Sequence, residues 1–310
     1  MDRFEEMRTF VRVVDTGSFI EAARCMNAAR SAVSRRVADL EARLGVQLLK
    51  RTTRRVSLTE AGQLFYQRCQ RILADLEDSE RAVASEHREI QGLIRIATPL
   101  SFGLRHLSPV LDEFLSQHPA LRVDLNLNDS MINLMAEDID LGIRIGKLQD
   151  SSMMARRLAS INLLVCASPA YLAEFGEPQT PEALAQHQGL DYSNVPEGQL
   201  WQFKDSSGKT SAVKLSYRMR ANNGDVLLKA AIDGLGVLVT PSFIAHEAIR
   251  SRQLKPILCD YSIGSSNIYA IYPAQRHLPH RVRALIDFLA QRFASNPYWN
   301  NLGLDQVDSI

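Results

Sequence analysis

Serine and arginine side chains cluster in one short segment near the N-terminus, SAVSRRVADLE at residues 31–41. Aliphatic residues recur there at the spacing of one helical face, and the stripe continues beyond the segment: Val33, Val37, Leu40 and Leu44. The opposite face carries hydroxyl and guanidinium groups, which donate to phosphates and base edges. The pattern therefore predicts a helix that packs on a protein core through one face and contacts DNA through Ser31, Ser34 and Arg35 on the other, with Arg30 and Arg36 as further candidate contacts.

The two adjacent arginines are expected to differ. Arg35 lies on the outer face, where it can reach base edges and affect specificity. Arg36 lies at the edge of the apolar stripe, which suits phosphate contacts and an effect mainly on affinity.

The preceding residues predict the partner helices. Apolar residues recur at helical spacing from Phe4 to Val14, and Ser18 with Glu21 is typical of a capping box at the start of the next helix. Two helices joined by a tight turn indicate a helix-turn-helix. The alternative is an ordinary three-helix bundle with a solvated arginine face.

A basic hairpin is predicted directly after this helix. Two strand-like segments flank KRTTRR within VQLLKRTTRRVSLTEAG, residues 46–62. Such a hairpin can act as a wing that reaches phosphates or the minor groove, here with the candidates Arg51, Thr53, Arg54 and Arg55. A solvated turn is the alternative.

The charge distribution supports a nucleic-acid partner for this region alone. Residues 1–58 carry twelve Lys and Arg against seven Asp and Glu, a net charge of +5. The rest of the chain carries 24 basic and 28 acidic residues, a net charge of −4, so the whole protein has only +1. A basic head on an acidic body predicts a polyanion partner for the head.

Residues 4–62 closely resemble the N-terminal domain of LysR-type transcriptional regulators. The motifs that carry the resemblance are FVRVVDTGSFIEAAR, SAVSRRVADLEARLGVQLLKR and VSLTEAG. Leu49 departs from the family pattern, which usually has Phe there. The resemblance implies a winged helix-turn-helix that binds double-stranded promoter DNA as a homodimer or homotetramer, with RNA polymerase as a further candidate partner.

A long linker helix is predicted over residues 59–90, after a DNA-binding domain at residues 1–58. Thr59 can cap it, and no glycine or proline follows Gly62 before Gly92. Apolar residues at alternating four- and three-residue spacing predict a dimerisation seam that includes Phe65, Ile72 and Leu76. Packing of this helix onto its own body domain is the alternative.

Residues 91–295 predict an α/β body with two lobes. Strand and helix patterns alternate, which indicates βαβ units with a parallel sheet. Lobe I is expected at about 91–161 and 266–295, and lobe II at about 162–265, as in periplasmic solute-binding proteins. DLGIRIG, ASPAYL and GLGVLVTPSF resemble the regulatory domain of the same family. The tail at residues 296–310 matches no pattern.

The inter-lobe cleft is the predicted effector site. Ligands of open α/β sheets bind at the carboxyl ends of strands, beside helix N-termini. We expect a small effector with a carboxylate, bound by Thr98, Leu100, Ser101, Phe102, Asn128, Arg144, Asn222, Asn223, Thr240 and Pro241. Helix capping or lobe-bridging hydrogen bonds are the alternatives for these residues.

Other classes of function find less support. No nucleophile elbow, P-loop, metal cluster or catalytic triad is visible, so we expect neither an enzyme nor a bound metal or cofactor. The N-terminus lacks a secretory signal, which argues against an exported solute binder and favours a cytoplasmic protein without a membrane partner. Redox sensing by Cys69, Cys166 or Cys259 remains an alternative to a small effector.

Overall fold

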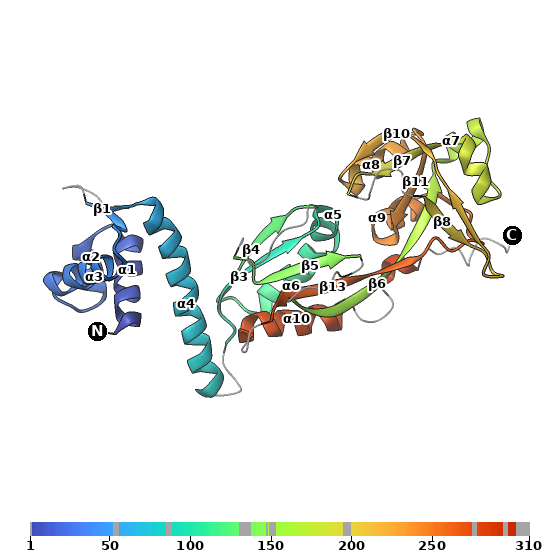
Figure 1. The fold of residues 1–310 in the computed structure, drawn as a ribbon. Helices are drawn as coiled ribbons and strands as arrows, with labels where there is room; N and C mark the ends of the chain where they lie inside the picture. Colours follow the sequence, from blue (N-terminus) through green and yellow to red (C-terminus); the bar gives the residue numbers. More distant parts are fainter. Residues whose placement is uncertain are drawn as a thin grey trace. The chain divides into compact units, whose positions relative to one another are not determined.

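The computed structural model describes residues 2–51, 56–84, 89–129, 138–146, 148, 153–194, 200–274, 278–293 and 297–301. The chain divides into two compact units, Met1–Arg88 and Glu89–Ile310 (Figure 1). The segment MINLMAED, predicted as a short helix, lies almost wholly outside the described residues. Among the helices that are described, none is long and apolar enough to cross a membrane.

The first unit contains three packed helices, a hairpin and a long helix. The elements are α1 (Arg3–Thr16), α2 (Phe19–Cys25), α3 (Arg30–Leu44), β1 (Leu49–Arg51), β2 (Val56–Leu58) and α4 (Glu60–Ala84). Ser18 Oγ accepts hydrogen bonds from the amides of Ile20 and Glu21, so the predicted cap at the start of α2 is confirmed. Gly17 and Gly45 end α1 and α3 in the left-handed conformation that favours glycine.

The predicted stripe of α3 forms the core of this unit. Val33, Val37 and Leu40 are fully buried with Phe10 and Val13 of α1. Burial of each such side chain stabilises the fold by roughly 1.5–3 kcal/mol. The fourth stripe position differs, because Leu44 stands at the end of α3 and is 37% exposed.

The start of α4 belongs to the same core. Thr59 Oγ1 accepts from the amide of Gly62 at 2.9 Å, which confirms the predicted cap. Phe65 then packs on Phe10, with ring centroids 5.7 Å apart, and Cys69 is fully buried.

The second unit is built on strands in the order β10-β7-β11-β6-β13-β5-β3-β4, with β12 also paired to β6. β3 lies parallel to β4 and β5, whereas β13 runs antiparallel to β5 and β6. The parallel pairing predicted for the first βαβ series is confirmed, while the sheet as a whole is mixed, because β6 and β13 pair antiparallel to their neighbours.

Lobe I surrounds the first part of this sheet. Its elements are β3 (Gly92–Thr98), α5 (Leu100–Phe102), η1 (Gly103–Leu107), α6 (Ser108–Gln117), β4 (Leu121–Leu127), β5 (Leu141–Ile145), β13 (Ser265–Pro273) and α10 (His280–Phe293). The last strand and helix return to this lobe as predicted, and α6 and α10 pack together through Phe114 and Phe288 (Figure 1).

Lobe II holds the other strands. Its elements are α7 (Pro169–Phe175), η2 (Pro181–Gln186), β7 (Gln188–Tyr192), β8 (Trp201–Lys204), β9 (Thr210–Val213), β10 (Ser216–Ala221), α8 (Gly224–Ile232), β11 (Val237–Pro241), α9 (Ser242–Arg250) and β12 (Lys255–Ile257). β8 and β9 form the hairpin predicted around KDSSGK. β6 (Met153–Ala167) is long enough to pair with strands of both lobes. A helix-turn-helix unit followed in the chain by a two-lobed mixed α/β body confirms the predicted fold class.

Candidate DNA interface and effector cleft

The outer face of α3 presents the predicted DNA contacts. Arg30, Ser31 and Arg35 are exposed, and Ser34 is partly exposed. The Arg35 side chain is 78% exposed, and its nearest carboxylate is Asp39 at 3.8 Å, a weak surface pair. Ser31 and Arg35 therefore stand on the side of α3 opposite Val33 and Val37, whereas Arg30 lies on the apolar side and is exposed at the first residue of the helix.

Arg36 has a different position from its neighbour. Its Nη1 donates to Glu5 Oε1 of α1 at 2.9 Å, and both side chains are about one third exposed. Farther along α3, Arg43 makes two hydrogen bonds to Glu6, which is 4% exposed. The structure thus gives Arg36 an intramolecular partner that ties α3 to α1.

The strands of the predicted wing form an antiparallel hairpin. Leu49 pairs with Leu58, and Arg51 pairs with Val56. The two amides of Leu48 and Leu49 donate to Glu41 Oε1 at 2.8 and 3.0 Å, so α3 and the hairpin are held together. Thr53, Arg54 and Arg55 lie outside the described residues.

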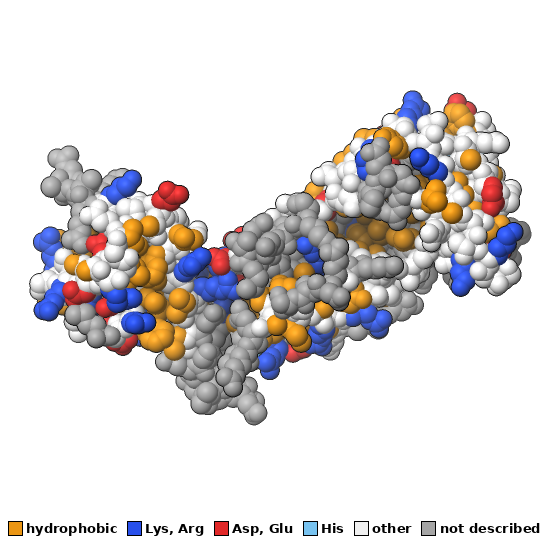
Figure 2. Space-filling model, in the orientation of Figure 1, with side chains coloured by type: hydrophobic (Ala, Val, Ile, Leu, Met, Phe, Trp, Pro, Cys, Tyr) orange, Lys and Arg blue, Asp and Glu red, His pale blue; other side chains and the backbone are white. Residues whose placement is uncertain are grey.

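The predicted dimerisation seam is one stripe on α4, covered by the core of its own unit at the start of the helix and more exposed farther along. Phe65 and Cys69 face the core of the DNA-binding unit, which neither the dimer prediction nor the alternative of packing on the body domain anticipated. Ile72 is 41% exposed, Leu64 is 52% exposed and Leu76 is partly buried. Figure 2 shows hydrophobic side chains gathered with Lys and Arg on the visible face of this unit.

A cleft between the two lobes forms a cavity of about 1210 Å³. Figure 2 shows it as a recess with hydrophobic side chains inside. Four of the predicted effector residues line it: Ser101, Arg144, Thr240 and Pro241. Burial lowers the pKa of Arg144 from its ordinary value, although its guanidinium keeps its charge at neutral pH.

The remaining predicted effector residues have other surroundings. Phe102 is fully buried against Phe243, and Thr98 is 2% exposed. Asn223 caps α8, since its Oδ1 accepts from the amides of Asp225 and Val226. Leu100, Asn128 and Asn222 are absent from the described lining of the cavity. A position at the end of a strand does not by itself show whether a residue lines the cleft, caps a helix or packs in the core.

Much of the lining escaped prediction because it is apolar and comes from distant segments. Tyr192 and Trp201 belong to β7 and β8, Leu163 to β6 and Ile263 to the loop before β13. Apolar residues carry no chemical signal in a sequence, so only the tertiary structure brings them together. The cavity can therefore hold a molecule with a substantial apolar part.

At this cleft the carboxylates of two aspartates accept hydrogen bonds from the nearby polar groups. Asp225 of lobe II accepts from Ser101 Oγ at 2.6 Å and from Arg105 Nε and Nη2 at 2.8 and 2.5 Å. Asp129 of lobe I accepts from the amide of Leu100 at 2.9 Å and from Asn223 Nδ2 at 2.9 Å. These contacts join the lobes, as the lobe-bridging alternative for Ser101 anticipated.

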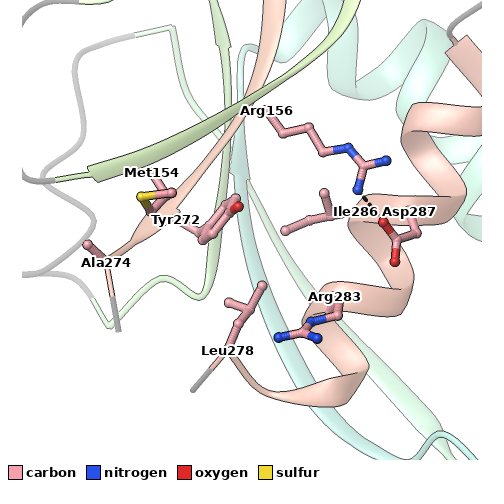
Figure 3. A pocket seen from close by; sticks show the side chains of 8 residues that line it. All are labelled: Met154, Arg156, Tyr272, Ala274, Leu278, Arg283, Ile286 and Asp287. Atoms are coloured by element: carbon pink, nitrogen blue, oxygen red, sulfur yellow. Dashed lines mark hydrogen bonds and ion pairs between the residues drawn. The ribbon is translucent and has the colours of Figure 1, made fainter. Parts of the chain in front are cut away.

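A second depression, of about 570 Å³, lies on lobe I between β6, β13 and α10 (Figure 3). Arg156 and Asp287 form an ion pair beside it, and Met154 is 51% exposed. None of the predicted effector residues lines this depression.

The described residues contain no group of three or more His, Cys, Asp or Glu that could hold a metal ion. Cys69 and Cys166 are buried, and burial raises the pKa of each thiol to about 12. Cys25 and Cys259 are exposed. Since the thiolate is the reactive form, the two buried cysteines are poor candidates for redox sensing.

Comparison with known proteins identifies both units. Residues 4–63 match the family model described as bacterial regulatory helix-turn-helix protein, lysR family, and residues 87–294 match the LysR substrate binding domain. An uncharacterized HTH-type transcriptional regulator of Haemophilus influenzae is 36% identical, over 92% of this chain and 99% of that protein. The regulator CrgA of Neisseria meningitidis is 35% identical, over 94% and 97%.

Solved structures agree with these sequence matches. CrgA, a LysR-type transcriptional regulator from Neisseria meningitidis, matches with a TM-score of 0.61 and 35% identity over 93% of this chain and 98% of that chain. The full-length virulence activator AphB of Vibrio cholerae matches with a TM-score of 0.59 and 29% identity over 94% and 99%. The chain belongs to the LysR family of transcriptional regulators, with a helix-turn-helix DNA-binding domain and an effector-binding domain.

Proposed function

We propose that α3 reads promoter DNA in the major groove and that a small molecule in the inter-lobe cleft controls this binding. The observation that carries the DNA part is the outer face of α3, where Ser31 and Arg35 are exposed opposite a fully buried stripe, with Arg30 exposed at the start of the helix. Arg51 with Thr53, Arg54 and Arg55 would add phosphate contacts from the hairpin. In this proposal Arg36 holds α3 to α1 through its ion pair with Glu5, and it can also contact a DNA phosphate.

The effector of this proposal carries a carboxylate on an apolar body. The contacts of Asp225 support the prediction of a carboxylate on the effector. The carboxylate of Asp225 accepts hydrogen bonds from Ser101 and Arg105, and these donors suit any carboxylate. An effector would compete with Asp225 for these donors and so loosen or rearrange the contact between the lobes. Arg144 and Thr240 are further candidate contacts, and the apolar lining would take the rest of the molecule.

Self-association is part of the same proposal. Leu64 and Ile72 are exposed apolar residues on α4, and a second α4 that covered them would form a dimer with two DNA-reading helices. Assembly of dimers into a tetramer and contact with RNA polymerase remain predictions. A protein with this role would act in the cytoplasm, where bacterial DNA lies.

Binding of the purified chain to DNA from its own upstream region tests the proposal. We expect protection of a defined site and a steep loss of affinity with salt, because phosphate contacts release counterions. Arg35→Ala should lower affinity for that site about 10-fold or more while binding to random DNA changes little. Arg283→Ala, an exposed arginine on α10, is the matched control and should change neither. Lack of protection with and without small carboxylates would contradict the proposal.

A further inference from the structure

The segment that follows α10 is built into the body, although it lies beyond the residues that match the family model. Tyr298–Asn300 form a short 3-10 turn, η3, after Pro297. Trp299 in this turn is fully buried, and it is among the largest buried side chains of the described structure. A surface tail would leave such a side chain exposed, so the turn must have a place in the fold.

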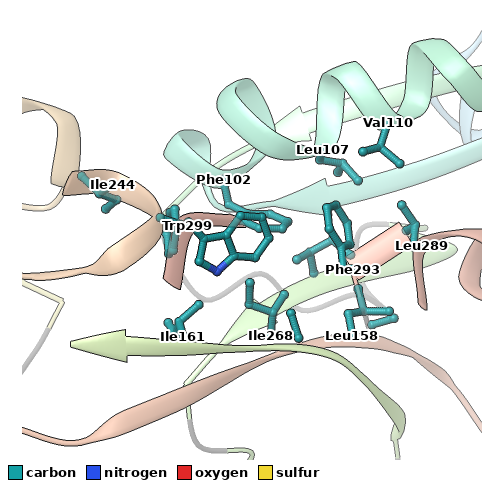
Figure 4. Packing of buried hydrophobic residues seen from close by; sticks show 14 of the residues in the cluster. Phe102, Leu107, Val110, Leu158, Ile161, Ile244, Ile268, Leu289, Phe293 and Trp299 are labelled. Carbon is teal, nitrogen blue, oxygen red and sulfur yellow. The ribbon is translucent and has the colours of Figure 1, made fainter. Parts of the chain in front are cut away.

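Trp299 packs among residues of lobe I. Its ring lies 4.8 Å from the ring of His106, 5.8 Å from Phe293 and 6.1 Å from Phe102, measured between centroids (Figure 4). These partners come from η1, α10 and α5. Figure 4 also shows Ile161 of β6 next to the indole and Ile244 of α9 farther off on the same side, so Trp299 sits at the side of lobe I from which α9 approaches.

Asn300 connects the same turn to β6 and α9. Its Oδ1 accepts from Ser242 Oγ at 2.7 Å and from the amide of Asn162 at 3.3 Å. Its Nδ2 donates to the carbonyl of Ser160 at 3.2 Å. One amide side chain therefore binds the first residue of α9 and two residues of β6, with its oxygen accepting and its nitrogen donating as an amide requires.

Tyr298 adds a third link through His106. The tyrosine hydroxyl donates to Nδ1 of His106 at 2.5 Å, and Nε2 of His106 donates to the carbonyl of Phe243 at 3.0 Å. The Tyr298 ring also lies 5.3 Å from the ring of His246 in α9. The turn thus contacts η1 of lobe I and α9 of lobe II.

The bonded residues of β6 are those at which the strand passes between the lobes. Ser160 pairs with Asn267 of β13, in lobe I, whereas Leu163 pairs with Pro241 of β11, in lobe II. A rotation of one lobe against the other must be absorbed by backbone torsions at such a crossing. Asn300 binds both Ser160 and Asn162 there, and it also holds α9, which would move with lobe II.

We propose that Pro297–Asn301 is a hinge strap that restrains rotation of the lobes and so sets how far the effector cleft opens. Trp299 is its anchor in lobe I, and Asn300 is the positioning residue at the crossing. The regulatory meaning of the strap rests on the proposed effector control of the cleft. The restraint itself depends only on the contacts described above.

Hydrogen–deuterium exchange of the full-length chain tests the strap without effector or DNA. Asn300→Ala removes the contacts of the amide and leaves Trp299 in place. We expect exchange in a peptide spanning residues 158–166 to become about fivefold faster, which corresponds to ~1 kcal/mol. Ser242→Ala removes only the lobe II contact and should act in the same direction. Asn126→Ala, at an exposed position on the edge strand β4, is the matched control and should leave this peptide unchanged.

The proposal is tested by which segments of the chain exchange faster. Unchanged exchange at residues 158–166 in Asn300→Ala overturns the proposal, and so does an equal increase in β3 and α10, which would indicate global destabilisation. Trp201→Phe gives an independent measurement, because the chain has two tryptophans and Trp299 then remains as the sole tryptophan, which can be excited selectively over the tyrosines. Acrylamide quenching of Trp299 should rise with Asn300→Ala and stay constant with Asn126→Ala. Since no effector is present, failure of the proposed effector control would leave these results intact.

Discussion

Asp225 of α8 and Ser101 of α5 form a 2.6 Å hydrogen bond across the mouth of the cleft, and Arg105 binds the same carboxylate. The contact joins a helix start in one lobe to a helix start in the other. It also places a carboxylate of the protein at the position where the sequence predicts that of an effector.

Asp225→Asn should weaken this contact, because the neutral amide loses the charge-assisted bonds to Arg105. We expect a loss of about 1–2 kcal/mol in the free energy of unfolding, measured with urea. Asp233→Asn, at the residue that follows α8 and in a surface pair with Lys229, is the control and should change stability by less than about 0.5 kcal/mol. Equal losses in the two variants would contradict a special role for Asp225.

Arg35 and Arg36 should separate DNA recognition from stability of the DNA-binding unit. Arg36→Ala removes the ion pair with Glu5, and we expect a loss of about 0.5–1 kcal/mol in a urea titration, a modest value because the pair is partly exposed. Glu5→Gln should give a similar loss, and the double variant should lose little more. Arg35→Ala should leave stability unchanged. Additive losses for Arg36 and Glu5 would show that the pair contributes nothing.

Gly62→Ala should destabilise the first unit although alanine favours helices. A Cβ at this position would lie 2.0 Å from the carbonyl oxygen of Leu48, a backbone atom that cannot move away alone. Helix propensity by itself predicts a gain of about 1 kcal/mol, so a measured loss would identify the steric cause. Thermal unfolding compares it with Gln63→Ala, an exposed neighbour that should show little change. Stabilisation by Gly62→Ala would refute the close approach of α4 to the hairpin.

His106 should make the second unit less stable in mild acid. Burial lowers its pKa from 6.5 to about 4; Phe243 and Glu247 oppose this decrease, and Arg105 and His246 add to it. Between pH 6.5 and 4 the unfolded chain binds a proton that the folded chain does not. Stability therefore falls as pH decreases through this window, by up to about 3 kcal/mol.

Urea unfolding at about pH 7 and about pH 4.5 measures this effect. His106→Gln should flatten the pH dependence relative to the unchanged chain, because glutamine does not titrate. His280→Gln, at an exposed position at the start of α10, should keep the original slope. Identical slopes in all three proteins would remove His106 as the cause.

Thiol labelling should distinguish the four cysteines. Cys25 and Cys259 are exposed and should react with Ellman's reagent in the native protein. Although the Cys259 residue is exposed, partial burial of its thiol and then Asp260 raise its pKa, so its reaction should be slow for an exposed thiol. Cys69 and Cys166 should react only after denaturation, since burial raises the pKa of each to about 12. Native labelling of Cys69 or Cys166 would restore the redox alternative.

The sequence alone determined the organisation of the DNA-binding unit. Periodic apolar residues, the Ser18 cap and Gly45 define local structure over short distances, and the core stripe Val33, Val37 and Leu40 follows from helical geometry. The alternation of strands and helices likewise predicted the two lobes and the return of the last strand to lobe I. These features are local, or they follow from general packing rules, so the residue pattern contains them.

Tertiary structure alone decided the partners of individual polar side chains and the apolar lining of the cleft. Arg36 bonds Glu5 across 31 positions of sequence, and Asp225 bonds Ser101 across 124. No sequence period specifies such contacts, because they depend on how separate elements pack and on which donors remain within reach. Trp299 shows the same limit: its segment matched no pattern, yet its indole is fully buried at the side of lobe I from which α9 approaches.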